Sequence, residues 1–311
     1  MQLIRETTEF QLHHNTAVAL GKFDGVHTGH RVLLAELLKK KARGLQTCVF
    51  TFDPPPAVLF GFSDGRELST REEKRRLFAQ LGIDVLIEFP LTRQTADIPG
   101  EEFVRSYLSG RMQAKFIAAG EDLSFGRGGR GDAKLLRSLS GELGYEMCLI
   151  PKVCVDGEEV SSTRIRGLVE QGDMERAERM LGAPYLICGT VVKGNQIGRT
   201  LGFPTVNLLP PPDKLLPPCG VYASEVSCDG QTWQAISNVG YKPTVSREHV
   251  MGVESYLYDF DADIYGKEIE VALHSFHRPE KRFDSMDGLK AQLQCDISFL
   301  GKNRQKKQKK L

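Results

Sequence analysis

The chain has 311 residues, more than one hydrophobic core usually accommodates, so we expect two domains. Its residues are 41% hydrophobic and 26% charged, which is ordinary for a globular protein and leaves enough apolar material for two cores. A formal net charge of +1 excludes a global field that would steer the chain toward nucleic acid or an anionic membrane.

The cysteines and the N-terminus indicate a reducing, intracellular location. The seven cysteines are odd in number and scattered, without a C-x-x-C pair, which argues against a disulfide framework and a structural zinc site. The N-terminal stretch MQLIRETTEF has no basic-then-apolar signal pattern, and no apolar run approaches the roughly 18 residues that span a bilayer. We therefore expect a cytoplasmic protein without a membrane partner.

The first half of the chain alternates apolar, strand-like runs with amphipathic helices. The expected strands cover 17–20, 47–52, 85–89 and 116–120, and the expected helices cover 30–42, 70–82, 101–110 and 132–144. This β-α rhythm predicts an α/β domain with a doubly wound parallel sheet, Rossmann-like in architecture. Ligands of such sheets bind at the carboxyl ends of the strands.

A first candidate site lies where the run 17–20 ends, in the sequence GKFDGVHTGHRVLL. His27 and His30 are three residues apart at the start of a predicted helix, so their side chains face the same side. The helix N-terminus adds free N–H groups and partial positive charge, while Gly21, Gly25 and Gly29 allow close backbone approach. Two imidazole donors there suit an α-phosphate that gains charge during in-line displacement. The alternative is a pair of surface histidines near a turn.

Two further segments carry charges that suit the same ligand. The stretch GEDLSFGRGGRGD (120–132) is expected to form a flexible basic loop, or simply a surface loop. In VSSTRIRGLVEQG, Ser162 and Thr163 are good helix N-caps, and Arg164 and Arg166 fall in the first turn. Cations at a helix N-terminus oppose the helix dipole unless an anion binds there, so a polyphosphate is predicted. The alternative is a capped surface helix.

From Cys188 onward the pattern changes to short strands separated by Gly and Pro. The expected strands cover 189–194, 205–209, 220–226, 233–240, 253–260 and 267–276. Period-2 alternation with frequent turn residues predicts an antiparallel β-barrel or sandwich, closed by a helix at 284–300. The basic tail 301–311 is expected to be a solubilising end, with a weak nucleic-acid contact as the alternative.

A second candidate site begins in GTVVKGNQIGRTLGFPTVN, which is glycine-rich but lacks the G-K-[ST] of a Walker A loop. Gly194, Gly198 and Gly202 punctuate strand-like segments and suggest a backbone arch over phosphates. Thr205 and Asn207 lie two apart on a strand, so they share one face, and their oxygens can help to hold Mg²⁺. The alternative is a turn followed by a core strand.

Glu254 is a candidate general base in the second half. It lies within an aromatic-rich strand and faces the opposite way from Val253 and Ser255. A carboxylate there can take a proton from a substrate hydroxyl, a contribution of about 10²–10⁴ in rate. The alternative is a solvated strand face.

Together these motifs resemble the nucleotidyltransferase superfamily marked by H-x-G-H and a distant S-S-T-x-x-R, and more closely the bacterial bifunctional riboflavin kinase/FAD synthetase family. The resemblance is carried by G-K-F-D-G-V-H-T-G-H, F-T-F-D-P-P-P, G-E-D-L-S-F-G and V-S-S-T-R-I-R, and it continues through the second domain. It covers nearly the whole chain apart from the tail. It implies an FMN adenylyltransferase domain over 1–183, a riboflavin kinase barrel over 184–300 and a basic tail over 301–311.

The resemblance also implies ligands and residue roles. The ligands are ATP as co-substrate, Mg²⁺, and riboflavin, FMN and FAD as substrates and products. In the first domain, His27 and His30 would stabilise the α-phosphate, and the ATP and phosphate contacts would be Gly21, Phe23, Asp24, Gly29, Asp122, Ser162, Thr163 and Arg166. In the second, Glu254 would be the base, Thr205 and Asn207 would hold the metal, and further ATP or flavin contacts would be Gly194, Gly198, Arg199, Gly202 and Pro204. The aromatic segments around Tyr241, Tyr256 and Phe283 would suit a flat apolar ring.

The chain departs from the family pattern at three positions. Family members often carry His where this chain has Pro55 and Phe where it has Leu123, and the P-T-A-N motif reads P-T-V-N. The first two changes lie around the predicted adenylylation site. Two alternatives stay open: an adenylyltransferase for another substrate with an unrelated barrel, and a non-catalytic flavin- or RNA-binding module. The resemblance favours small-molecule substrates, no nucleic acid, and a monomer or weak oligomer.

Overall fold

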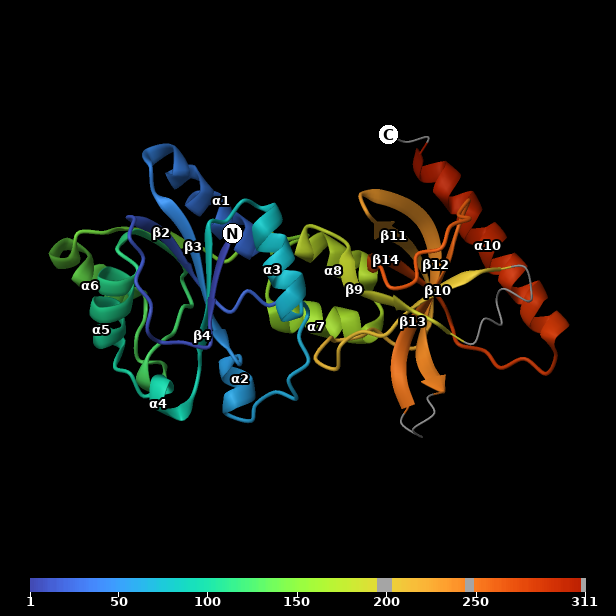
Figure 1. The fold of residues 1–311 in the computed structure, drawn as a ribbon, viewed down its shortest axis with the longest axis horizontal. Helices are drawn as coiled ribbons and strands as arrows, with labels where there is room; N and C mark the ends of the chain where they lie inside the picture. Colours follow the sequence, from blue (N-terminus) through green and yellow to red (C-terminus); the bar gives the residue numbers. More distant parts are fainter. Residues whose placement is uncertain (195–202, 244–248, 309–311) are drawn as a thin grey trace. The chain divides into compact units, whose positions relative to one another are not determined.

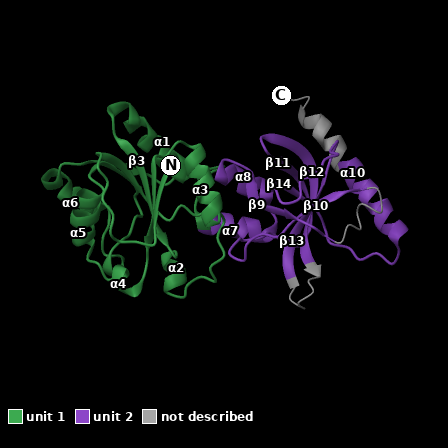
Figure 2. Cartoon of the chain, viewed as in Figure 1, with its two compact units in different colours: residues 1–162 green, residues 163–311 purple. Residues whose placement is uncertain are grey.

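The computed structural model describes residues 1–194, 203–243 and 249–308, and the chain divides into two compact units. Unit 1 covers Met1–Ser162 and unit 2 covers Thr163–Leu311 (Figure 2). The stretch 163–183, which the sequence analysis assigned to the first domain, therefore lies in unit 2. In the part of the chain that the structure describes, none of the helices combines the length and the apolarity that a bilayer crossing requires.

Unit 1 is built on a six-stranded parallel sheet, which confirms the doubly wound prediction (Figure 1). In spatial order the strands are β1 (Gln2–Arg5), β4 (Val85–Pro90), β3 (Gln46–Asp53), β2 (Thr16–Leu20), β5 (Ala114–Gly120) and β6 (Glu146–Ile150). The four central strands are the four expected from the sequence. The strand order reverses between β2 and β5, and such a switch point is where open α/β sheets bind ligands.

Helices cover both faces of this sheet because alternate strand residues point to opposite sides. Val18 and Leu20 belong to one core, which also includes residues of η2 and α6, whereas Ala17 and Ala19 belong to the other, which includes residues of α1 and α3. The helical elements are α1 (Thr28–Lys39), η1 (Lys40–Arg43), α2 (Pro56–Leu59), α3 (Arg71–Gln80), α4 (Arg93–Ala96), α5 (Gly100–Glu102), the π-helix η2 (Phe103–Arg111), η3 (Arg127–Gly129) and α6 (Ala133–Leu143).

A short hairpin and two helices connect the sheet of unit 1 to the barrel of unit 2. The hairpin is formed by β7 (Cys154–Val155) and β8 (Glu158–Glu159), and the helices are α7 (Ser162–Gln171) and α8 (Met174–Leu181). The buried face of α8 includes Met174, Ala177 and Met180, and α8 packs against β9 and β14 of the barrel.

Unit 2 contains a closed six-stranded antiparallel barrel, so the barrel alternative is the correct one. Around the barrel the strands are β10 (Thr205–Leu208), β13 (His249–Leu257), β12 (Gln231–Pro243), β11 (Gly220–Cys228), β14 (Glu268–Pro279) and β9 (Tyr185–Val192). The long helix α10 (Met286–Gln308) follows β14. It is attached to the barrel by Arg278, whose guanidinium binds the buried carboxylate of Asp296 at 2.6 Å.

Candidate active sites

The first site begins in a strained turn at the carboxyl end of β2. Phe23 and Val26 have positive φ angles of 52° and 41°, and Gly25 between them has φ 81°. Residues other than glycine rarely adopt positive φ angles. Such backbone conformations persist where the surrounding structure enforces them. Both Phe23 and Val26 are fully buried. The core therefore holds the turn in place, directly before the first histidine.

The side chain of Phe23 is buried and packs against His30. Its ring is 0% exposed and lies 5.0 Å from the His30 ring and 5.6 Å, edge-on, from the Phe78 ring. Gly21 is needed above it, because a Cβ at that position would meet the Phe23 ring at 3.1 Å. The Phe23 ring therefore packs beneath His30, and the predicted contact of Phe23 with the nucleotide stays a prediction.

His27 and His30 lie together at the start of α1, as their three-residue spacing predicts. Their rings stack with centroids 3.7 Å apart and an interplanar angle of 18°. His27 is the N-cap, and its Nδ1 accepts the backbone N–H of His30 at 3.4 Å. Because Nδ1 is an acceptor, the neutral ring carries its proton on Nε2, where it can donate. Gly29 makes room, since a Cβ there would lie 3.3 Å from the His27 ring.

Both histidines are held in the uncharged form. Burial lowers the pKa of His27 to about 4, against the smaller opposing effects of Asp24 and Asp122. Burial also lowers the pKa of His30 well below its usual value, helped by the neighbouring His27 and by Lys74. The stacked pair therefore presents neutral N–H donors, not imidazolium ions, at neutral pH.

Two buried polar atoms at this helix start have no hydrogen-bond partner among the described residues. They are the hydroxyl of Thr28 and Nδ1 of His30. Buried polar atoms are almost always paired, so an unpaired set at a helix N-terminus suggests that a ligand completes it. An anion with several oxygens fits this place, because the helix dipole and the imidazole donors favour negative charge.

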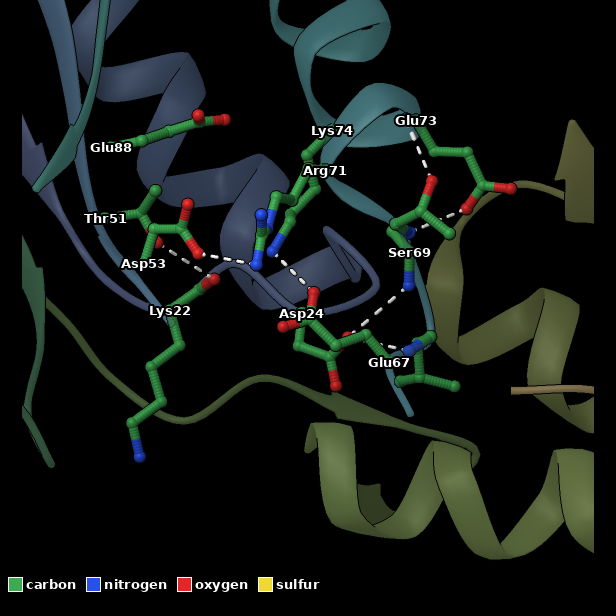
Figure 3. Close-up of polar contacts among 12 residues, drawn as sticks. Lys22, Asp24, Thr51, Asp53, Glu67, Ser69, Arg71, Glu73, Lys74 and Glu88 are labelled. Atoms are coloured by element: carbon green, nitrogen blue, oxygen red, sulfur yellow. Dashed lines mark hydrogen bonds and ion pairs between the residues drawn. The ribbon is translucent and has the colours of Figure 1, made fainter. Parts of the chain in front are cut away.

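Asp24, in the first predicted segment, contacts Ser162 of the V-S-S-T-R-I-R segment and also the backbone before α3. Asp24 Oδ1 accepts backbone N–H groups from Leu68 at 2.8 Å and from Ser69 at 3.4 Å (Figure 3). The main-chain oxygen of Asp24 accepts the hydroxyl of Ser162 at 2.9 Å. Ser162 is the first residue of α7, not its cap, and the predicted phosphate contacts Thr163 and Arg166 follow within that helix.

A buried ion pair near this site was not predicted. Lys74 Nζ on α3 binds Glu67 Oε2 at 2.7 Å, with side chains only 7% and 9% exposed. Arg71 binds Asp53 at 2.8 Å in the same cluster (Figure 3). The charge of Lys74 contributes to the low pKa of His30, so the cluster belongs to the electrostatic environment of the site. In the sequence Arg71 and Lys74 look like part of an ordinary charged helix face.

The second site lies on the barrel, where two adjacent strands, β10 and β13, present polar side chains. Thr205 Oγ1 donates to Glu254 Oε1 at 2.6 Å, and Asn207 is directly paired with Glu254 across β10 and β13. Val253 and Ser255 are buried inside the barrel, so Glu254 faces the other way, as the alternation predicts. The predicted base and the two predicted metal ligands thus share one face.

The residues around Asn207 fit an oxygen-preferring cation. Gly194 lies against the amide, since a Cβ there would come within 2.5 Å of Asn207 Nδ2. No group of three His, Cys, Asp or Glu side chains suited to a metal occurs among the described residues. Mg²⁺ is commonly held by few protein oxygens together with substrate phosphates, which is the kind of donor set that Thr205 and Asn207 offer.

A cavity of about 400 Å³ opens beside these residues. Its lining includes Gly194, Pro204, Thr205 and Asn207 from the predicted site, and also the acidic segment Asp261–Asp263, which was not predicted. Three predicted contacts, Gly198, Arg199 and Gly202, lie outside the described residues.

The aromatic residues predicted for a flat ring occupy different surroundings. Tyr241 is 58% exposed, whereas Tyr256 is half-buried and its ring lies 5.9 Å from that of Phe203. Phe283 lies under the ammonium of Lys281, 5.6 Å from its ring centre.

Comparison with protein families finds two matches that divide the chain. The family model for FAD synthetase matches residues 9–164, and the model for riboflavin kinase matches residues 181–303. The matches fall on the segments that carry the two candidate sites.

Similar proteins cover nearly the whole chain. The bifunctional riboflavin kinase/FMN adenylyltransferase of Listeria monocytogenes is 35% identical over 93% of both chains. The protein of the same name from Escherichia coli K12 is 37% identical over 90% of both chains. A crystal structure named as a macrolide-efflux protein from Streptococcus pneumoniae superimposes with a TM-score of 0.84 at 31% identity, over 95% of this chain and 97% of that one.

Proposed function

Because this chain belongs to the family of bifunctional riboflavin kinases/FMN adenylyltransferases, we propose that its two halves catalyse successive steps of flavin cofactor synthesis. The barrel phosphorylates riboflavin with ATP to give FMN and ADP. The parallel-sheet half joins FMN to the AMP part of a second ATP, giving FAD and pyrophosphate. The proposed catalytic domains are 1–183 and 184–300, followed by the tail 301–311.

In the kinase step, the terminal hydroxyl oxygen of the ribityl chain attacks the γ-phosphorus of ATP and ADP leaves. Glu254 orients this hydroxyl and takes its proton, which is typically worth about 10²–10⁴ in rate. The hydrogen bond from Thr205 to the same carboxylate supports the role, because it fixes the direction of the carboxylate. Phosphoryl transfer needs mainly such positioning and charge neutralisation.

Thr205 and Asn207 are proposed to hold Mg²⁺ together with the ATP phosphates. When bound, Mg²⁺ would neutralise phosphate charge during transfer. The hydroxyl of Thr205 donates its proton to Glu254, so its oxygen lone pairs stay available. Gly194 and Pro204 line the cavity beside them, and we propose the same nucleotide site for Gly198, Arg199 and Gly202.

In the adenylyl step, a phosphate oxygen of FMN attacks the α-phosphorus of ATP, and the bond to the pyrophosphate oxygen breaks. Neutral His27 and His30 donate hydrogen bonds to the α-phosphate oxygens, whose charge increases in the transition state. The unpartnered Nδ1 of His30 is the single observation that most supports this role. We propose that Thr163 and Arg166 bind the outgoing phosphates.

The remaining predicted residues act around these donors. Gly21 and Gly29 allow the close packing at the turn, and Phe23 supports His30 from below. Asp24 and Ser162 hold the turn through their mutual contact, and Asp122 contributes negative charge near His27. We further propose a cytoplasmic monomer or weak oligomer that acts on small molecules and not on nucleic acid.

Incubation with riboflavin and Mg-ATP, followed by chromatography of the flavins, tests both steps. His30→Ala should accumulate FMN with FAD formation reduced about 10²–10³-fold, because one preorganised donor is lost. Glu254→Gln should stop riboflavin phosphorylation but still convert supplied FMN to FAD. Loss of both products in a folded His30→Ala variant would refute the division of labour, and wild-type FMN output from Glu254→Gln would remove Glu254 as the base.

A further inference from the structure

A third polar residue extends the row that contains Glu254. Asn238 on β12 is paired directly with Glu254 on β13, just as Asn207 on β10 is paired with it from the other side. Directly paired residues project to the same face of a sheet, with Cβ atoms about 4.5–5.5 Å apart. Asn207, Glu254 and Asn238 therefore form one row across three strands.

Glu280, which follows β14, holds the amide of Asn238. Asn238 Nδ2 donates to Glu280 Oε1 at 3.1 Å. The carboxylate lies against the backbone of Gly240, where an added Cβ would clash with Oε1. Gly240 lies two residues beyond Asn238 on the same face of β12. The missing side chain at 240 thus makes the space from which Glu280 reaches Asn238.

The contact with Glu280 leaves most of the Asn238 amide available. An asparagine amide has two N–H donors and one carbonyl oxygen, and among the described residues only one N–H is used here. Asn238 is half-buried, beside the carboxylate that we propose to act on the substrate hydroxyl. Its carbonyl oxygen and second N–H are suited to a hydroxyl-bearing ligand.

We propose that Asn238 binds a hydroxyl of the polyol chain of the kinase substrate, and that Glu280 is a positioning residue that acts through Asn238. The inference rests on the proposed function, because it requires the reacting hydroxyl to lie at Glu254. A polyol that enters the site loses water from each hydroxyl and needs a partner for each. Asn238 is one strand spacing, about 4.8 Å, from Glu254 and meets a hydroxyl further along the same chain.

A double-mutant cycle in the full-length protein tests the route through Asn238. The kinetic constants for riboflavin and for ATP are measured. The KM for ATP is the control for folding of the barrel, and adenylyl transfer to supplied FMN controls for the amount of enzyme. Asn238→Ala and Glu280→Ala should each raise the KM for riboflavin about three- to tenfold, as expected for one lost hydrogen bond, and leave the KM for ATP unchanged. The double variant should be no worse than Asn238→Ala alone.

Two further variants separate positioning from general structure. Glu280→Gln keeps a carbonyl oxygen that accepts from Asn238 and should restore riboflavin binding. Gly240→Ala puts a methyl group where the Glu280 carboxylate lies, and should reproduce Glu280→Ala without removing any polar group. This variant also keeps the test usable if Glu280→Ala folds poorly.

The outcomes distinguish this inference from the proposed function. Additive effects in the double variant, or wild-type kinetics in both Glu280→Ala and Gly240→Ala, would overturn the role of Glu280. Wild-type kinetics in Asn238→Ala would show that Asn238 does not bind the substrate. The role of Glu254 as the base would still stand if Glu254→Gln were inactive. Absence of FMN formation by the wild-type protein would instead reject the kinase function itself.

Discussion

At the scale of single residues, the histidine pair depends on burial to stay uncharged. An exposed histidine is half protonated near pH 6.5, and an imidazolium stacked on a second imidazolium would be strongly unfavourable. In the folded protein the pKa of His27 is about 4, because burial favours the neutral ring. The pair can therefore offer the same N–H donors throughout the neutral range.

This low pKa predicts how stability depends on pH. The unfolded chain takes up a proton at His27 as the pH falls below about 6.5, whereas the folded chain does so only near pH 4. The contribution is therefore present above pH 6.5 and is lost as the pH falls toward 4. The variant His27→Asn keeps a residue suited to the N-cap but cannot take up this proton. From pH 7 to pH 5 its free energy of unfolding should therefore fall by about 2 kcal/mol less than that of the wild type.

Denaturant unfolding of both proteins at the two pH values measures this difference. Parallel losses in wild type and His27→Asn would show that the folded pKa of His27 is ordinary, and the argument for a neutral donor pair would fail.

Sequence reasoning found residues whose partners are close along the chain. The spacing of His27 and His30 predicts that they face the same side, and the spacing of Thr205 and Asn207 predicts their common face. It did not find the Lys74–Glu67 pair or Glu280, because each acquires its role only when the fold brings another segment beside it. The packing of the Phe23 ring under His30 was not predicted either, since a motif does not show which neighbours a side chain acquires in the fold.

At the scale of secondary structure, the barrel contains a chain of hydroxyl groups in its interior. Ser224, Ser237 and Ser255 come from three adjacent strands and are almost fully buried. Their oxygens are linked at 2.8 Å and 2.7 Å, with Ser237 in the middle. Buried hydroxyls are costly unless they are paired, so the three serines depend on one another.

Ser237→Ala should therefore destabilise unit 2 by about 1–3 kcal/mol, because it leaves two buried hydroxyls without their shared partner. Ser227→Ala is the matched control, since Ser227 makes a similar 2.8 Å contact with Thr232 at the exposed end of the β11–β12 hairpin. That variant should stay within about 0.5 kcal/mol of wild type. If urea unfolding gave the same loss of unfolding free energy for both variants, the buried hydroxyl chain would stabilise unit 2 no more than the exposed contact does.

The central strands of the sheet were predictable and its edge strands were not. β2 is buried along its whole length and gives a strong apolar signal. β1 has no buried residue, and β6 buries only Ile150 although four of its five residues are apolar, so neither shows the continuous burial of β2. These strands form because the neighbouring strand offers hydrogen-bonding groups, which is a property of the assembled sheet and not of the segment.

At the scale of the whole molecule, each compact unit contains its own set of polar groups suited to a nucleoside triphosphate. The histidine pair belongs to unit 1, and the Thr205–Glu254 contact belongs to unit 2. The change from β-α rhythm to short strands predicts two domains that meet at 183/184, whereas the compact units divide after Ser162. The assignment of α7 and α8 was less predictable, because their amphipathic pattern shows that they pack but not against which core.

Mixing two single-site variants tests the central claim, that two independent chemistries share one chain. His30→Ala alone should convert riboflavin to FMN, and Glu254→Gln alone should leave riboflavin unchanged. Supplied together with riboflavin and Mg-ATP, the two variants should produce FAD after a lag, because FMN made by one is adenylylated by the other. If the mixture forms no FAD although each variant retains its own step, the two sites do not work independently and the account is contradicted.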